Sequence, residues 1–300
     1  MLIGMLAGVV AGPAAASTLY ATSLNAEGDD LLIQIDPATG QVQSSIGVSA
    51  GIFGPWPFAT NIAFAPNGKL FGTSLNASGD DLLIEIDPAT GQVLSSTGVS
   101  AGIFGPWPFG TDIAFASNGD LYGTSLNAAG QDLLIQIDPA TGQVLSSIGV
   151  SAGIFGPWPF ATNIAIAPNG KLFGTSLNAA GDDLLIEIDP ATGQVLSSTG
   201  VSAGIFGPWP FDTDIAFAPD GTLYGTSLNA EGDDLLIQID PATGQVQSST
   251  GVSAGIFGPW PFATDIAFVP AQSVPEPGTL PILALGAVGV LGLMRRRKAP

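Results

Sequence analysis

A segment of 51 residues is repeated along almost the whole chain, and this repeat constrains the fold more than any other feature. The letters TSLN occur five times, always 51 positions apart, beginning at Thr22, Thr73, Thr124, Thr175 and Thr226. A comparison of residues 22–72 with residues 73–123 gives nine differences in 51 positions. Near-identical units should form near-identical structures, so we expect an array of one supersecondary unit.

Each repeat contains four short segments with strand character, separated by turn residues. In the first complete copy these segments are residues 60–65, 69–75, 82–87 and 92–99. The turns are PNG and DPATG, in which Pro fixes φ, Asp can cap the turn and Gly takes a positive φ. Four strands in one repeat of this length are typical of a β-propeller blade. Large Ile and Phe side chains would then face small Ala residues across neighbouring blades.

The two ends of the repeat region predict the number of blades. Residues 18–24 match the second strand of a repeat without a first strand before them, and residues 264–269 match a first strand without a second after them. Pairing these two segments completes a blade and leaves no strand over. The sequence therefore predicts an all-β fold, a five-bladed β-propeller over residues 17–271 that is closed by strands from both ends. An open solenoid would instead need capping repeats, and the sequence has none.

The connections between strands should gather at two rims of such a propeller. If the strands run outward from the axis in chain order, the second-to-third loop and the long fourth-to-first connection share one rim, and the PNG and DPATG turns share the other. The long connection contains GIFGPWPF in every copy. A Trp between two prolines sits in stiff, extended backbone, which lowers the entropy cost of presenting its ring to a sugar. These candidate ligand-binding residues are Trp56, Trp107, Trp158, Trp209 and Trp260. The alternative is that the aromatic residues form a lid over the gap between blades.

A second set of candidates directly follows the Thr that precedes each first strand. It comprises Asn61, Asp112, Asn163, Asp214 and Asp265. In a propeller this position lies near the mouth of the central channel, so the five side chains could surround the axis and hold water or a cation. Capping of the strand end by each Asx side chain is the alternative.

Acidic residues also cluster in the second-to-third loops, as in Asp80-Asp81 of NASGDD. Carboxylates near Gly and Asn are oxygen ligands of the kind that Ca²⁺ binds, although the spacing does not match an EF-hand loop. A solvated loop is the alternative. We therefore expect no cofactor, and calcium is the one ion that the residue types favour.

Composition excludes several classes of function. The chain contains neither Cys nor His, which removes thiol nucleophiles, imidazole bases, disulfides and the usual zinc ligands. Residues 17–273 contain 24 acidic and two basic residues, a net charge of 2 − 24 = −22, which repels phosphate backbones and makes nucleic acid an unsuitable partner. Catalysis requires unlike groups in one pocket, whereas near-copies supply similar environments.

Both ends of the chain have the composition of targeting segments. Residues 1–16 combine an apolar run with Ala14-Ala15-Ala16, the small-residue pattern of a secretory signal, but without a basic start. Near the other end, Val274-Pro275-Glu276-Pro277 precedes an apolar stretch over residues 279–294, and then Arg295-Arg296-Arg297-Lys298. As a helix the stretch would span about 24 Å, less than a bilayer core of about 30 Å. The basic residues should remain cytoplasmic and leave the repeats outside.

This order of Pro-Glu-Pro, apolar helix and basic cluster over residues 272–300 resembles the PEP-CTERM sorting signal of Gram-negative bacteria. The resemblance implies recognition by an exosortase, a membrane protease that removes the tail near Pro275-Glu276-Pro277. It also implies transient residence in the inner membrane and a final location in the envelope or outside the cell, in species that make extracellular polysaccharide. An ordinary tail anchor is the alternative.

Together these features predict an exported, non-enzymatic protein that binds extracellular polysaccharide at several equivalent sites or has a structural role at the surface. The alternative is a propeller hydrolase or lactonase with a site at the channel mouth. Such an enzyme would need one distinctive blade, and Asp212, which replaces Ala or Gly in the other copies, is the only residue that suggests one.

Overall fold

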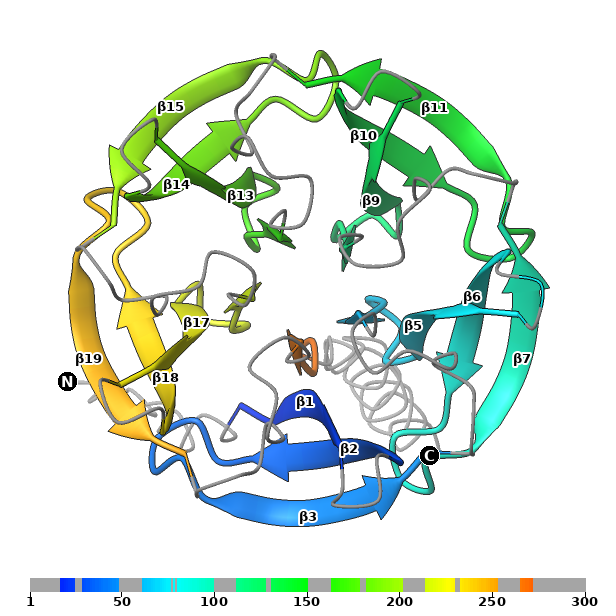
Figure 1. Cartoon of the computed structure of the whole chain (residues 1–300), viewed down its shortest axis with the longest axis horizontal. Coiled ribbons are helices and arrows are strands. Elements are labelled where there is room, and N and C mark those ends of the chain that lie inside the picture. The colour runs from blue at the N-terminus through cyan, green and yellow to red at the C-terminus, as the bar shows by residue number, and fades with distance from the viewer. Residues whose placement is uncertain are drawn as a thin grey trace, which may run out of the picture. The chain divides into compact units, whose positions relative to one another are not determined.

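The repeat region forms five antiparallel sheets of four strands each around a central axis (Figure 1). A computed structural model describes residues 17–24, 29–48, 61–76, 78, 80–99, 112–127, 131–150, 163–178, 182–201, 214–229, 233–252 and 265–271. The predicted signal segment 1–16 and the predicted helix 279–294 lie outside these residues, so neither is tested by the structure. Among the residues described, no helix is long and apolar enough to cross a membrane.

Each sheet is one blade, and its strands follow from the axis outward in chain order, except that blade A begins with the last strand, β20. Blade A contains β20 (Ile266–Phe268), β1 (Leu19–Leu24), β2 (Asp30–Ile35) and β3 (Val42–Gly47). Blade B contains β4 (Ile62–Phe64), β5 (Leu70–Leu75), β6 (Asp81–Ile86) and β7 (Val93–Gly98). Blade C contains β8 (Ile113–Phe115), β9 (Leu121–Leu126), β10 (Asp132–Ile137) and β11 (Val144–Gly149). Blade D contains β12 (Ile164–Ile166), β13 (Leu172–Leu177), β14 (Asp183–Ile188) and β15 (Val195–Gly200). Blade E contains β16 (Ile215–Phe217), β17 (Leu223–Leu228), β18 (Asp234–Ile239) and β19 (Val246–Gly251).

Blade A closes the ring with strands from both ends of the repeat region. β20 pairs antiparallel with β1 in the register Leu19↔Phe268, Tyr20↔Ala267 and Ala21↔Ile266. The backbone N–H of Thr22 also donates to the carbonyl oxygen of Asp265 at 3.0 Å. The prediction of five blades with terminal strand closure is therefore confirmed.

The hydrophobic core consists of five clusters, one between each pair of neighbouring blades. Between blades B and C, the small side chains of Ala63 and Ala65 lie in the same cluster as the large Ile135 and Ile137. Successive residues of a strand point to opposite faces, so Leu83 packs toward blade C while Ile84 packs toward blade A. The predicted packing of large against small residues across blades is confirmed.

The first strands are shorter than the sequence predicted. The segment expected at residues 60–65 forms strand only at Ile62–Phe64. At its start, the N–H of Asn61 donates to the Thr73 side chain oxygen (3.3 Å) instead of a backbone carbonyl. At its end, the N–H of Gly68 donates to the Ala65 carbonyl oxygen and closes the PNG turn. The first strand therefore ends short of the predicted bounds on both sides.

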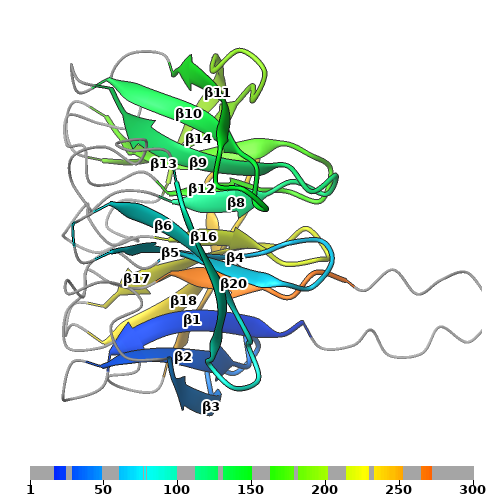
Figure 2. The ribbon, with the colours of Figure 1, turned by 90° about the vertical axis from the view of Figure 1, so that its right-hand side faces the viewer.

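Two rims result from this strand order (Figure 2). We call the side where second strands end and third strands begin the loop rim; pairs such as Leu24↔Asp30 mark it. The opposite side, where PNG turns join first to second strands, is the turn rim. β20 runs toward the turn rim, so the chain leaves blade A from that rim.

Candidate functional site

Five polar residues surround the axis at the loop rim, one before the first strand of each blade. The carboxyl groups of Asp112, Asp214 and Asp265 are buried, and oxygens from all three lie within 4.8 Å of one another. Asn61 and Asn163 are half-buried members of the same set. The structure thus brings together the five residues that the sequence singled out at this position. We call these five residues the axial ring.

Each Asp of the axial ring joins its own blade to the next one. Asp112 accepts a hydrogen bond from the N–H of Ile113 in its own blade (2.7 Å) and another from the N–H of Ile164 in blade D. Asp214 and Asp265 repeat this arrangement toward the next blades. These side chains therefore cap the strand ends, as the alternative interpretation of the sequence required, and they also connect blades.

The two Asn residues supply the hydrogen-bond donors between neighbouring Asp residues. The Nδ2 atom of Asn61 donates to Oδ1 of Asp112, and that of Asn163 donates to Oδ1 of Asp214, both at 3.2 Å. In ring order from blade A to blade E the residues are Asp, Asn, Asp, Asn and Asp. Because five is an odd number, this alternation must fail once, and it fails between blades E and A, where Asp214 and Asp265 are neighbours.

Burial and the closeness of the three carboxyl groups set the electrostatics of the ring. Burial raises the pKa of Asp265 well above its usual range, and the nearby carboxylate of Asp214 raises it further. Burial also raises the pKa of Asp214, although hydrogen bonds from Asp265 and Ile266 oppose the shift. The oxygens of the two carboxyl groups lie within 4.8 Å of each other, and like charges at this distance favour one shared proton in the pair. Burial, followed by the charge of Asp214, raises the pKa of Asp112 as well.

The ring offers oxygen ligands, but acidic side chains alone do not define a metal site. Ca²⁺ takes six to eight oxygen ligands in proteins. The Asp carboxylates here already accept backbone N–H groups and share a proton. We therefore assign no metal to the axial ring.

In the acidic loops that the sequence suggested as calcium ligands, an Asn and an Asp of the same loop hydrogen-bond to each other. Oδ2 of Asp80 accepts a hydrogen bond from Nδ2 of Asn76 (2.8 Å), while Oδ1 of Asn76 accepts the N–H of Asp80 (2.9 Å). The same pair of bonds joins Asn178 with Asp182 and Asn229 with Asp233. The second acidic residue of each loop begins the third strand. The arrangement favours a loop-stabilising role for the first carboxylate.

The remaining sequence candidates lie outside the described residues. They are the five Trp residues of the long connections and the sorting-signal residues 274–277 and 295–297. Asp212, the one residue that suggested a distinctive blade, also lies outside them.

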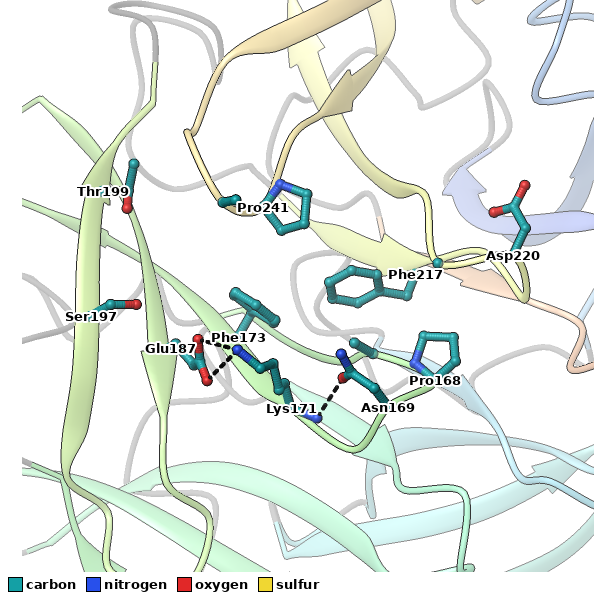
Figure 3. Close-up of a pocket in the computed structure, with 13 residues that line it drawn as sticks. Pro168, Asn169, Lys171, Phe173, Glu187, Ser197, Thr199, Phe217, Asp220 and Pro241 are labelled. Atoms are coloured by element: carbon teal, nitrogen blue, oxygen red, sulfur yellow. Dashed lines mark hydrogen bonds and ion pairs between the residues drawn. The ribbon is translucent and has the colours of Figure 1, made fainter.

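Sequence reasoning missed a groove between blades D and E on the turn rim (Figure 3). Its volume is about 550 Å³. Lys171 and Glu187 of blade D form an ion pair in it at 3.0 Å. The sequence did contain a signal for this site, because the only two basic residues between residues 17 and 273 belong to blades B and D, the two blades that carry Glu in the third strand.

The fold and the repeat define the class of this protein as a closed, five-bladed repeat β-propeller. A family model described as "Repeat of unknown function (DUF6923)" matches residues 121–263, and a PEP-CTERM protein-sorting motif matches residues 273–298. This is a repeat β-propeller protein that carries a PEP-CTERM sorting signal, as the resemblance in the sequence implied. The motif implies export, sorting to the envelope and processing by an exosortase. A search of curated proteins gives no match.

Solved structures resemble this chain at low sequence identity. An engineered GH43 glycoside hydrolase with endo-xylanase and exo-arabinofuranosidase activity is 10% identical to this chain, with a TM-score of 0.51. The match covers 86% of this chain and 53% of the hydrolase chain. The PQQ-bound aldose sugar dehydrogenase of Streptomyces coelicolor is 16% identical with a TM-score of 0.48, covering 85% and 86%. The BP39L lectin of Burkholderia pseudomallei is 15% identical with a TM-score of 0.46, covering 85% and 78%. For the glycoside hydrolase, the likeness at 10% identity concerns the fold alone.

Proposed function

We propose that this exported protein binds extracellular polysaccharide through the loop rim and catalyses no reaction. The observation that carries the proposal is the near-equivalence of the five blades, which have the same strand order and are joined by segments of nearly the same sequence. A polymer with a repeating unit can contact several such sites at once. Five weak sites then give an avidity that none has alone.

The Trp residues of the long connections are the proposed contact groups. Each connection leaves its blade after a residue such as Val48 and returns before a residue such as Asn61, and these flanking residues belong to the loop rim. Trp56 and its four equivalents each lie between two prolines. A ring held in stiff backbone loses little entropy when it stacks on a sugar.

The test is retention of the full chain on polysaccharide from the producing organism, compared with variants that carry Trp→Ala in one, two and all five connections. We expect retention to weaken stepwise, by about 1 kcal/mol or more per aromatic group removed. Unfolding curves of each variant serve as the control for folding. Retention that is indifferent to all five changes would remove the Trp contact sites, and no retention of the unmodified chain would leave a structural role at the surface.

One observation favours a second candidate, a hydrolase or lactonase at the channel mouth. Three carboxyl groups with raised pKa values meet at the axis, a pattern that also occurs in acid–base sites. However, the three Asp residues are at most 5% exposed and are engaged with backbone N–H groups. Release of reducing ends or opening of a lactone by the full chain, abolished by Asp112→Asn, would favour the enzyme over the binding protein.

A further inference from the structure

The groove between blades D and E combines apolar faces with a polar centre (Figure 3). Phe173 of blade D and Phe217 of blade E form one wall, with ring centroids 5.4 Å apart. Pro168 and Pro241 add apolar surface from two turns. The hydroxyl-bearing Ser197 and Thr199 come from the outer strand β15. Pockets that bind small ligands usually have this mixture of apolar lining and few, well-placed polar groups.

The polar centre is an ion pair that remains accessible. The Lys171 side chain is 52% exposed and that of Glu187 is 18% exposed. The Lys171 backbone N–H donates to Oδ1 of Asn169 (3.1 Å), which fixes the start of the strand under the pair. The ammonium group has three donor hydrogens and the carboxylate has several lone pairs, so the pair can give and accept further hydrogen bonds.

The ion pair and the aromatic pair also occur between blades B and C. Lys69 and Glu85 are 3.0 Å apart with side chains 52% and 16% exposed, and Phe71 packs with Phe115 at a centroid distance of 5.3 Å. At the other three junctions, the positions of Phe173 and Glu187 are taken by Tyr and Gln, namely Tyr20 and Gln34, Tyr122 and Gln136, and Tyr224 and Gln238. The ion pair therefore belongs to two of five junctions.

The charge of the surroundings restricts the ligand. Residues 17–273 have a net charge of 2 − 24 = −22, which repels anionic ligands. Lys171 is compensated by Glu187, and Asp220 at the edge of the groove adds a further negative charge. A monovalent cation would not use the Phe and Pro surfaces. A neutral sugar has apolar C–H faces for the aromatic wall and hydroxyl groups for the ion pair.

We propose that the groove at Lys171–Glu187 binds a short segment of neutral saccharide, and that the equivalent surface at Lys69–Glu85 does the same. The proposal deepens the function proposed above, because it names a neutral sugar, but it rests on residues of the turn rim and not on the Trp connections. The protein would then contact glycan on both rims, with up to five sites on one and two on the other.

The test measures saccharide binding at Lys69 and at Lys171 separately in the full chain. The protein is labelled with ¹⁵N only at lysine, which gives backbone amide signals from Lys69, Lys171 and Lys298. It is titrated with cellotriose, xylotriose, mannotriose and maltotriose, and with trigalacturonate as the acidic probe. We expect at least one neutral sugar to shift the Lys69 and Lys171 signals saturably and to leave the Lys298 signal unchanged.

The decisive variant is Glu187→Gln, which places in blade D the residue that blades A, C and E carry at this position. Because Gln is native to the equivalent strands, folding should be retained. We expect affinity measured at Lys171 to fall at least fivefold while affinity measured at Lys69 stays unchanged within the same molecule. Glu85→Gln should reverse the pattern.

Three results would overturn the proposal: no shift with any neutral sugar, a stronger response to trigalacturonate, or unchanged affinity at Lys171 in Glu187→Gln. These results are separable from failure of the proposed function. If the unmodified chain is still retained on the producer's polysaccharide and the Trp variants weaken retention, the loop rim binds glycan and the grooves do not. If the Trp changes leave retention unaffected or the unmodified chain is not retained, but the Lys signals respond to a neutral sugar, the turn rim binds saccharide and the loop rim does not.

Discussion

At the residue scale, the axial ring shows how one side-chain difference between repeats changes the chemistry of the whole axis. Asp and Asn have almost the same shape, and both can accept a backbone N–H group. Only Asn brings its own donor, so Asn61 and Asn163 can stand between carboxylates without any proton from solvent. Between Asp214 and Asp265 no amide is present, and a proton takes its place.

Replacement of Asp265 by Asn should therefore flatten the pH dependence of stability. The folded-state pKa of Asp265 is raised, so the folded protein holds a proton that the unfolded chain releases above its own pKa of about 4. Stability from this group is complete below that pKa and is lost as the pH rises toward the folded pKa, at up to about 1.4 kcal/mol per pH unit for one proton. In Asp265→Asn the introduced amide would donate to Asp214 at every pH, so urea unfolding from pH 5 to pH 8 should show a smaller slope.

The matched control is Asp220→Asn, which removes an exposed charge and introduces the residue that blade C carries as Asn118. This variant should keep the slope of the unmodified protein. At acid pH, a different carboxyl group affects the stability of the unmodified protein and of both variants. Hydrogen bonds from Thr141 and Ala140 lower the pKa of Asp138 in its DPATG turn, so this contribution is present above the unfolded pKa and is lost as the pH falls. An equal slope for Asp265→Asn and the unmodified protein would contradict the shared proton.

At the element scale, the DPATG turns connect blades as well as strands. Gly142 has φ of +67°, and a Cβ atom there would lie 2.5 Å from the Gly98 carbonyl oxygen of the preceding blade. The outer strands run along the perimeter of the ring, so each one ends against the turn of the next blade (Figure 1). Glycine is therefore required at this position by the turn and also by the close contact between blades.

A comparison of two alanine substitutions separates these two roles. Gly170 in a PNG turn also has a positive φ of +85°, but a Cβ atom there would meet no atom within 4 Å. We expect Gly170→Ala to cost about 1 kcal/mol of unfolding free energy from backbone strain alone. Gly142→Ala should cost about 1–3 kcal/mol more, because the outer strand of blade B must move. Equal costs in chemical denaturation would show that the turn does not support the junction.

At the scale of the whole molecule, ring closure depends on a strand of three residues. Ile266 and Phe268 are 3% and 7% exposed and complete the cluster between blades E and A. The same strand positions the carboxylate of Asp265, which bonds to the N–H of Ile62 in blade B. Blade A is thus joined to both neighbours through residues that are far from β1 in the sequence.

A chain that ends at residue 264 should therefore lose its closed monomeric form, whereas a chain that ends at residue 271 should keep it. Burial of Ile266 and Phe268 contributes about 3–6 kcal/mol, and its loss also exposes the inner edge of β1. An exposed edge promotes pairing between chains, and near-identical blades make strand exchange easy. Light scattering after size-exclusion chromatography should detect dimers or larger species only for the shorter chain. A monomer of unchanged stability would contradict the closure argument.

Much of this architecture was predictable because the strands and turns of each repeat are indicated by local sequence patterns. Alternating apolar residues, PNG and DPATG indicated four strands, and the phase of the two ends indicated five blades. The groove was harder to predict from the sequence, because Lys171 and Glu187 lie on paired strands of blade D and meet Phe217 only across the junction with blade E. The residues 49–60 and their equivalents, which contain the Trp candidates, remain a sequence prediction.

The sequence by itself determined the blade, its number of copies and the set of five Asx residues, because strand propensity, turn chemistry and apolar period are local properties repeated every 51 residues. Only the tertiary structure decided that these residues meet at the axis, where ring closure buries Asp112, Asp214 and Asp265 with oxygens within 4.8 Å of one another. Asp214 and Asp265 come from consecutive repeats, and in the closed ring they are the one pair of like neighbours. The physical reason is that a hydrogen-bond pattern of period two cannot close without a defect on a ring of five.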